Sequence, residues 1–172
     1  MLVVVVAGVA LSGCTVPRWQ PFAGPLDETS TIDIVNVGGG HLSARTYAGA
    51  EFCSDIEYGE AVGSPGNVAG LLATGGAARF VVQKNKLFTA NMAYVQMTSV
   101  CSMTISFVPK DDRYEVRAQQ QYEANRCSLN LVSSTGEKPV FVSRENRSPI
   151  IIGKREFCKP LLSYERTRLG LP

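Results

Sequence analysis

The chain has 172 residues, of which 45% are hydrophobic and 19% are charged, and this length and composition suit one folded domain with its own core. The formal net charge of only +2 at pH 7 argues against the strongly basic surface that nucleic-acid binding requires, so no nucleic-acid partner is expected. The single histidine, His41, removes most of the options for a metal site or a general base.

The N-terminal residues Leu2 to Leu11 are almost entirely apolar, yet this run is much shorter than the roughly 20 residues of a membrane-spanning helix. A short apolar run that ends on small residues is typical of a secretory signal peptide. The next residues, Leu11-Ser12-Gly13-Cys14, resemble the lipobox of bacterial lipoproteins. The resemblance implies that residues 1–13 are removed and that Cys14 carries a diacylglycerol and an acylated amino group. In Gram-negative lipoproteins an aspartate directly after the lipidated cysteine tends to keep the protein in the inner membrane. By the same resemblance, Thr15 at this position implies an outer-membrane anchor that faces the periplasm.

The segment after the lipobox has the composition of a linker. Residues 15–30 contain three prolines, one glycine and no steady hydrophobic period, so a flexible tether is predicted over 14–30. The folded domain is then expected to span 31–165, and residues 166–172 are expected to form a C-terminal tail.

Short apolar runs separated by turn-forming residues predict an all-β domain. The strand-like runs are 30–37, 42–47, 79–83, 87–97, 139–143 and 149–153. Gly, Pro, Asn and Asp divide them, which favours a two-sheet, immunoglobulin-like sandwich. The Gly-rich segment 59–78 is predicted to be a long loop.

The clearest pattern lies in residues 99–133. Cys101, Met103, Ile105 and Phe107 alternate with Ser102, Thr104 and Ser106, which predicts a strand with one apolar and one solvent-exposed face. After a turn at 109–113, the runs 114–123 and 127–132 alternate in the same way. The three runs are predicted to pair as an antiparallel meander. Tyr114 resembles the tyrosine corner of immunoglobulin-like sandwiches, which implies a buried hydroxyl bound to nearby backbone.

Four cysteines remain beside Cys14, and an even number in an exported chain predicts two disulfides. In the predicted meander Cys101 and Cys127 lie two strand spacings apart, about 9.5 Å, whereas a disulfide needs Cα atoms about 4.4–6.8 Å apart. The geometry therefore favours Cys53–Cys101 and Cys127–Cys158. Cys53–Cys127 with Cys101–Cys158 stays open as the alternative.

Charged residues gather in two places. Glu51, Asp55, Glu57 and Glu60 surround Cys53, and they are interpreted as a solvated acidic edge rather than a calcium site, because their spacing matches no EF-hand loop. From Lys138 onward eight Lys or Arg stand against three Glu. This basic C-terminal third is interpreted as a solvated surface, with contact to lipid phosphates or an acidic partner as the alternative.

No catalytic pattern is found, since His41 follows three glycines without a GxSxG motif. The sequence therefore indicates a non-catalytic, outer-membrane-anchored lipoprotein that acts as a binding or assembly module. It is expected to hold an envelope protein partner through loops or an exposed strand edge, without cofactor or metal. The alternatives are a soluble-ligand or enzyme-inhibitor module, and an envelope hydrolase that uses the 51–60 carboxylates.

Overall fold

The computed structural model describes residues 19–63, 70–95, 99–121, 126–149 and 158–172, so the lipobox and Cys14 lie outside the described residues. A short 3-10 helix, Leu26–Glu28, precedes the first strand. The remaining elements, in chain order, are β1 (Thr29–Asn36), β2 (Leu42–Gly49), β3 (Ser54–Glu57), β4 (Glu60–Val62), β5 (Leu71–Leu72), β6 (Ala77–Gln83), β7 (Phe88–Val95), β8 (Ser99–Phe107), β9 (Arg113–Gln121), β10 (Arg126–Ser133), β11 (Phe141–Pro149) and α1 (Ser163–Arg168).

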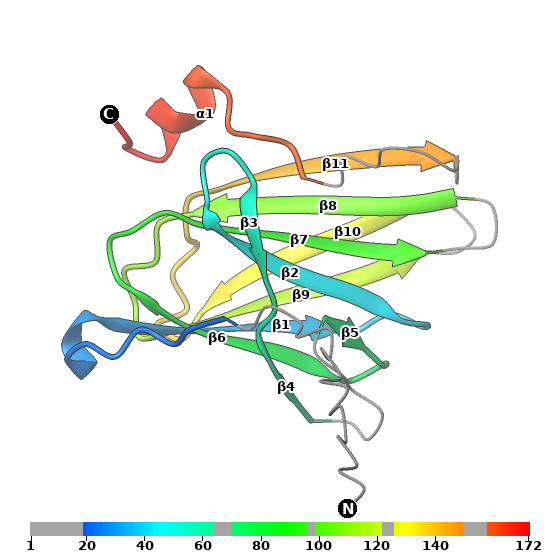
Figure 1. Ribbon diagram of the computed structural model, residues 1–172, viewed down its shortest axis with the longest axis horizontal. Helices are drawn as coiled ribbons and strands as arrows, with labels where there is room; N and C mark the ends of the chain where they lie inside the picture. Colours follow the sequence, from blue (N-terminus) through cyan, green and yellow to red (C-terminus); the bar gives the residue numbers. More distant parts are fainter. Residues whose placement is uncertain (1–18, 64–69, 96–98, 122–125, 150–157) are drawn as a thin grey trace, which may run out of the picture.

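The strands form two sheets, which confirms the all-β prediction (Figure 1). One sheet has the order β10-β9-β1-β6-β4 and the other has the order β11-β8-β7-β2-β3, with β5 beside β2. Only the pair β1 and β9 is parallel among the pairs of the described strands. The predicted loop over 59–78 differs, because β4 and β5 lie within it.

Side chains from both sheets meet in one core. A chain of aromatic rings runs through it, with successive ring centroids between 5.1 and 5.9 Å apart: Trp19, Phe80, Phe88, Phe107 and Tyr114. These tilted and edge-on contacts lie in the range that aromatic pairs prefer. The core is therefore continuous from the N-terminal segment to the turn before β9.

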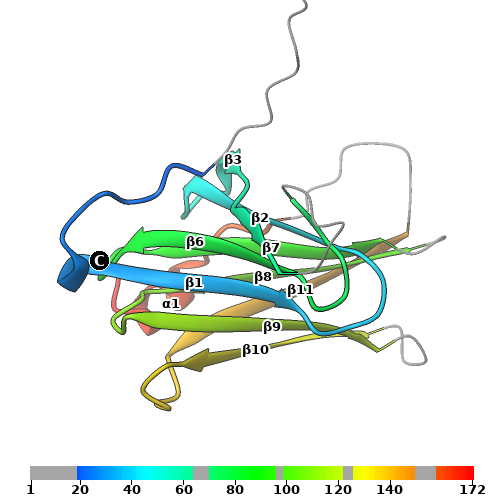
Figure 2. The ribbon, with the colours of Figure 1, turned by 90° about the horizontal axis from the view of Figure 1, so that it is seen from below.

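The predicted meander is wrong in one strand. β9 and β10 pair antiparallel as expected, but β8 belongs to the other sheet, where it lies between β7 and β11 (Figure 2). The turn at 109–113 thus carries the chain from one sheet to the other. Alternation of apolar and polar residues is the same for a strand that pairs with its neighbour and for one that faces it across a sandwich, so the pattern cannot distinguish them.

Tyr114 confirms the local prediction made for it. Its side chain is buried, and its hydroxyl accepts hydrogen bonds from the backbone N–H groups of Lys110 and Asp111 at 2.8 and 2.9 Å. The phenol therefore fastens the turn through which the chain crosses between the sheets.

The disulfides are Cys101–Cys127 and Cys53–Cys158, so the predicted pairs Cys53–Cys101 and Cys127–Cys158 are wrong. Because β8 and β10 lie in opposite sheets, Cys101 and Cys127 face each other across the core, with Cα atoms 6.2 Å apart. Cys53–Cys158, with Cα atoms 6.0 Å apart, joins the turn after β2 to residues 158–172, which we call the C-terminal segment. One bond thus links the two sheets and the other fastens the end of the chain.

Both ends of the described chain pack on the sandwich, so the tether predicted over 14–30 is wrong for residues 19–30, and the predicted C-terminal tail belongs to the folded domain. The backbone N–H of Phe22 donates to the carbonyl of Val81 at 2.9 Å, so residues 19–30 are attached to the domain. Helix α1 spans the predicted boundary at residue 165, and Arg166 pairs with Glu51. Neither of the helices described here is long and apolar enough to span a bilayer.

Candidate functional site

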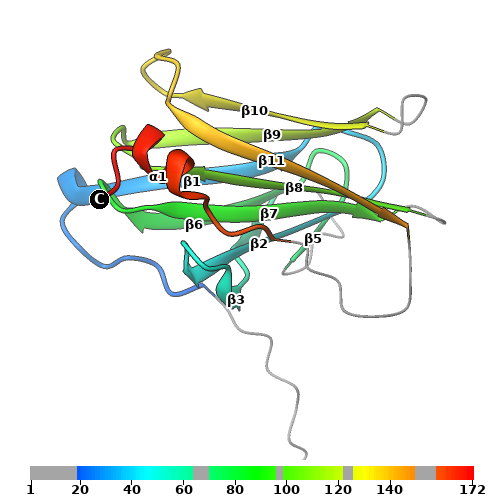
Figure 3. The same ribbon diagram turned by 90° about the horizontal axis from the view of Figure 1, so that it is seen from above.

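The outer face of the six-stranded sheet is polar, but it is not exposed as the sequence predicted. Ser102, Thr104 and Ser106 are each at most 2% exposed. The C-terminal segment crosses this side of the sheet on its way to α1 (Figures 1 and 3). We call the outward side chains of β7 and β8 beneath it the polar face: Thr89, Asn91, Ser102, Thr104 and Ser106.

Asn91 organises one half of the polar face. Its Nδ2 donates to Ser102 Oγ at 2.8 Å and lies 3.3 Å from Thr104 Oγ1, and its Oδ1 accepts from Arg45 Nε at 3.4 Å. A buried amide needs such partners, because an unpaired polar group in the interior is destabilising. The hydroxyl and amide groups of the two strands therefore satisfy one another.

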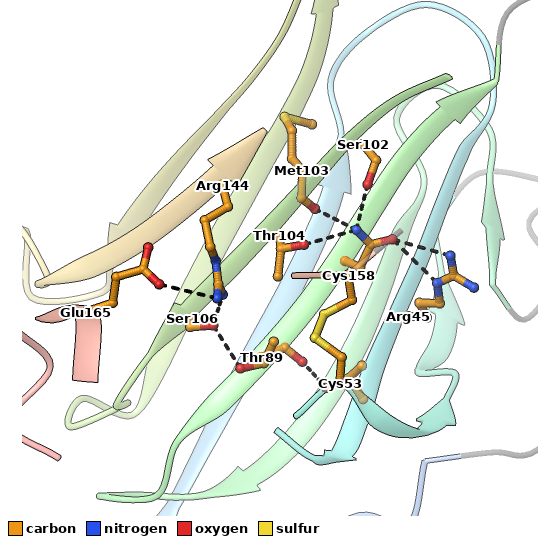
Figure 4. Close-up of a disulfide and its surroundings, with 12 residues drawn as sticks. Arg45, Cys53, Thr89, Ser102, Met103, Thr104, Ser106, Arg144, Cys158 and Glu165 are labelled. Carbon is orange, nitrogen blue, oxygen red and sulfur yellow. Dashed lines mark hydrogen bonds and ion pairs between the residues drawn. A yellow bond between two sulfur atoms is a disulfide. The ribbon is translucent and has the colours of Figure 1, made fainter. Parts of the chain in front are cut away.

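Arg144 of β11 connects the other half of the polar face to α1. Its Nη2 donates to Ser106 Oγ at 2.5 Å, and its Nη1 lies 3.7 Å from Glu165 Oε2 (Figure 4). Burial lowers the pKa of the Arg144 guanidinium from its ordinary value, whereas the charge of Glu165 raises it. Glu165 Oε2 also accepts the backbone N–H of Leu162 at 2.8 Å, which fixes the first turn of α1. The helix is thus held beside the start of β11.

A groove of about 530 Å³ runs between the start of β11 and α1, and we call it the β11–α1 groove. Its lining residues are Pro139, Val140, Phe141, Val142, Ser143, Tyr164, Glu165 and Arg168. Val140 is 59% exposed and Tyr164 is 69% exposed, although both carry large apolar side chains. In the described chain β11 is an edge strand of its sheet, and it pairs only with β8. The groove therefore combines a strand edge with exposed apolar groups.

A second hollow of about 360 Å³, lined by more charged side chains, adjoins the β11–α1 groove and shares Pro139, Val140 and Arg168 with it. Lys110 and Lys138 line this hollow together with Asp111 and Glu137. The Asp111 carboxylate accepts from the hydroxyl of Thr135 at 3.2 Å. Charges of both signs thus border the groove, as in the polar rim of a protein interface.

The predicted acidic cluster is only partly brought together. Glu51 is paired with Arg166, and Glu60 lies on β4 in the opposite sheet. Asp55 and Glu57 share β3, where Asp55 is exposed and Glu57 is half-buried. Burial raises the pKa of the Glu57 carboxyl, and the Asp55 carboxylate raises that pKa further. Among the residues with described positions, no group of three His, Cys, Asp or Glu side chains is placed to hold a metal ion.

His41 is exposed in the connection between β1 and β2. The β11–α1 groove, by contrast, was missed by the sequence prediction. Glu165 forms one half of a capping box with the N–H of Leu162, but leucine has no side-chain oxygen for the other half, so the sequence carries no capping-box signature there. No protein-family model, curated protein or solved structure matches the chain, so the candidate site rests on the geometry of this molecule alone.

Proposed function

We propose that the protein is a non-catalytic lipoprotein of the outer membrane, anchored through Cys14 on the periplasmic side, that binds an envelope protein partner in the β11–α1 groove. The observation that carries the proposal is a groove of about 530 Å³ between a terminal strand of a sheet and a helix, with exposed apolar side chains on both walls. An immunoglobulin-like class of sandwich belongs to the same proposal. The Tyr114 corner and the Cys101–Cys127 bond between the sheets support it.

The strand edge gives the partner a defined way to bind. Alternate N–H and C=O groups of an edge strand point away from the sheet, and an extended peptide can pair with them as an added strand. Among the described edge strands β11 has nine residues, β10 has eight, and β3 and β4 have four and three, so β11 is the longest template and the one that borders the groove. Val140 and Tyr164 then contribute apolar contacts, and tyrosine is among the residues enriched at interfaces.

Site-specific photo-crosslinking in intact cells tests the binding site. A photoreactive residue at Val140 or at Tyr164 is expected to give one product that contains the same partner, because both side chains border the groove. The matched control is Val132 on β10, an exposed valine at the edge of the other sheet, and it is expected to give no such product.

A charge at the groove makes the test specific. With the photoreactive residue at position 164, Val140→Lys is expected to reduce the product about tenfold, because losing an apolar contact near the centre of an interface costs about 1–2 kcal/mol. Val132→Lys is expected to leave the product unchanged. Equal products from all three positions, or a product of two copies of this chain, would contradict the proposal.

The lipid anchor is tested by Cys14→Ser. Each buried methylene of an acyl chain contributes about 0.8 kcal/mol, so two or three chains hold a protein on a membrane almost permanently. The variant is expected to keep the circular dichroism spectrum of the wild type but to leave the membrane fraction. Fractionation after a salt wash measures this, and a variant that still sediments with the outer membrane would refute the lipid anchor.

A further inference from the structure

An apolar cleft of about 440 Å³ lies on another part of the molecule, between the N-terminal segment, the end of β2 and the turn from β6 to β7. We call it the N-terminal cleft. Its main walls are the rings of Trp19, Phe22, Tyr47 and Phe88 and the side chain of Leu87. The volume falls within the range of about 300–1,000 Å³ that is usual for small-molecule sites.

The wall formed by the N-terminal segment is fixed in place. The backbone N–H of Trp19 donates to the carbonyl of Tyr58 at 2.9 Å, and its indole Nε1 donates to the carbonyl of Val81 at 3.1 Å. The N–H of Phe22 donates to the same Val81 carbonyl. The Trp19 ring also packs edge-on against Phe80, with centroids 5.9 Å apart. The cleft is therefore formed before any ligand arrives, which lowers the entropic cost of binding.

The charge of the cleft selects the kind of ligand. Among the described residues that line it, Lys86 is the only cation and none is acidic. Lys86 is exposed, so its ammonium group lies at the mouth of the cleft, whereas Tyr47 and Phe88 are buried. The hydroxyl of Thr46 is already used, because it donates to the carbonyl of Thr89 at 2.7 Å.

We propose that the N-terminal cleft binds one single-chain alkyl carboxylate, with the alkyl chain against Trp19, Phe22 and Phe88 and the carboxylate at Lys86. A peptide is disfavoured because each of its amides would need a hydrogen-bond partner inside a mainly apolar cleft. An unbranched alkyl chain has no such requirement, and its single charged end matches the single cation at the mouth. The proposal depends on neither the lipid anchor nor the partner at the β11–α1 groove.

Isothermal titration of the full chain carrying Cys14→Ser with octanoate, decanoate and dodecanoate tests the proposal, below the concentrations at which these compounds form micelles. The substitution prevents attached acyl groups from competing for the cleft. Affinity is expected to rise about fourfold for each methylene added, until the cleft is full. Lys86→Met is expected to weaken dodecanoate binding about fivefold and to leave dodecanol binding unchanged, whereas Lys159→Met, at an exposed lysine of the C-terminal segment, changes neither.

A filled cleft provides the decisive control. Ala48 lines the cleft, and Ala48→Phe is expected to lower dodecanoate affinity at least tenfold, while Ala50→Phe, two residues away and outside the lining, has little effect. Both variants are expected to keep the crosslink at the β11–α1 groove, which separates the two proposals. The absence of dodecanoate binding, an affinity that does not depend on chain length, or equal effects of Ala48→Phe and Ala50→Phe would each overturn the proposal.

Discussion

Replacing Cys101 and Cys127 together by alanine is expected to lower the free energy of unfolding by about 3–5 kcal/mol. The bond closes a loop with a sequence separation of 26, for which the chain-entropy model gives about 3.5 kcal/mol. Both cysteines are also buried in the core between the sheets, so their loss removes packing. Urea unfolding measures the change, and the fluorescence of Trp19, the only tryptophan, reports on the core directly.

The matched control is the pair Cys53→Ala and Cys158→Ala. Its loop is longer, with a sequence separation of 105, and the same model gives about 4.8 kcal/mol for it. A smaller effect on the sandwich is nevertheless expected, because this bond holds the C-terminal segment to the turn after β2 and does not join the two sheets. Global destabilisation at least as large as that of the Cys101 and Cys127 variant would contradict this division of roles.

Asn36→Leu is expected to lower the free energy of unfolding by a similar amount, about 3–5 kcal/mol, through lost hydrogen bonds. Asn36 is fully buried at the end of β1. Its Nδ2 donates to the carbonyls of Gly40 and Leu72, each at 3.0 Å, and its Oδ1 accepts from the N–H of Gly38 and from the hydroxyl of Tyr94. Leucine at this position leaves the two carbonyls, the N–H and the hydroxyl buried without the side-chain amide that bonds them. Each unsatisfied buried group costs about 1–3 kcal/mol.

Tyr94→Phe provides the comparison, because it removes only one hydroxyl from the same network. An effect of about 1–2 kcal/mol is expected for it by urea unfolding. A double-mutant cycle with Asn36→Leu is expected to show coupling, since the two side chains are in contact at 2.7 Å. Equal destabilisation by the two single variants, or strict additivity, would show that Asn36 does not act as the hub of the network.

The features that were predictable from the sequence are those that depend on neighbouring residues. The inward face of Cys101, Met103, Ile105 and Phe107 follows from alternation, and all four side chains are buried. The hydroxyl of Tyr114 is bound by backbone only three and four residues away, so a local pattern was enough to predict its role.

The features that were not predictable depend on which strand lies beside which. The disulfide pairing depends on β8 crossing to the other sheet, and alternation contains no information about that choice. Ser102 and Ser106 were expected in solvent, but segments remote in sequence cover their face: Arg144 is 38 residues from Ser106 and itself pairs with Glu165. The β11–α1 groove likewise joins 139–143 to 164–168, so no single stretch of sequence predicts it.

The composition of the polar face makes detachment of the C-terminal segment an event distinct from unfolding. Asn91 is bonded to Ser102, and Thr89 to Ser106, so these bonds remain when the segment leaves. The surface then uncovered carries hydroxyl and amide groups rather than hydrocarbon, and its hydration offsets much of the lost contact. Separation of α1 from the polar face is therefore expected to need less free energy than unfolding of the sandwich, and the Cys53–Cys158 bond limits how far the segment can move. A ligand that binds only while α1 is in place stabilises this arrangement by mass action. Binding in the β11–α1 groove is therefore expected to slow the hydrogen exchange of the α1 backbone amides.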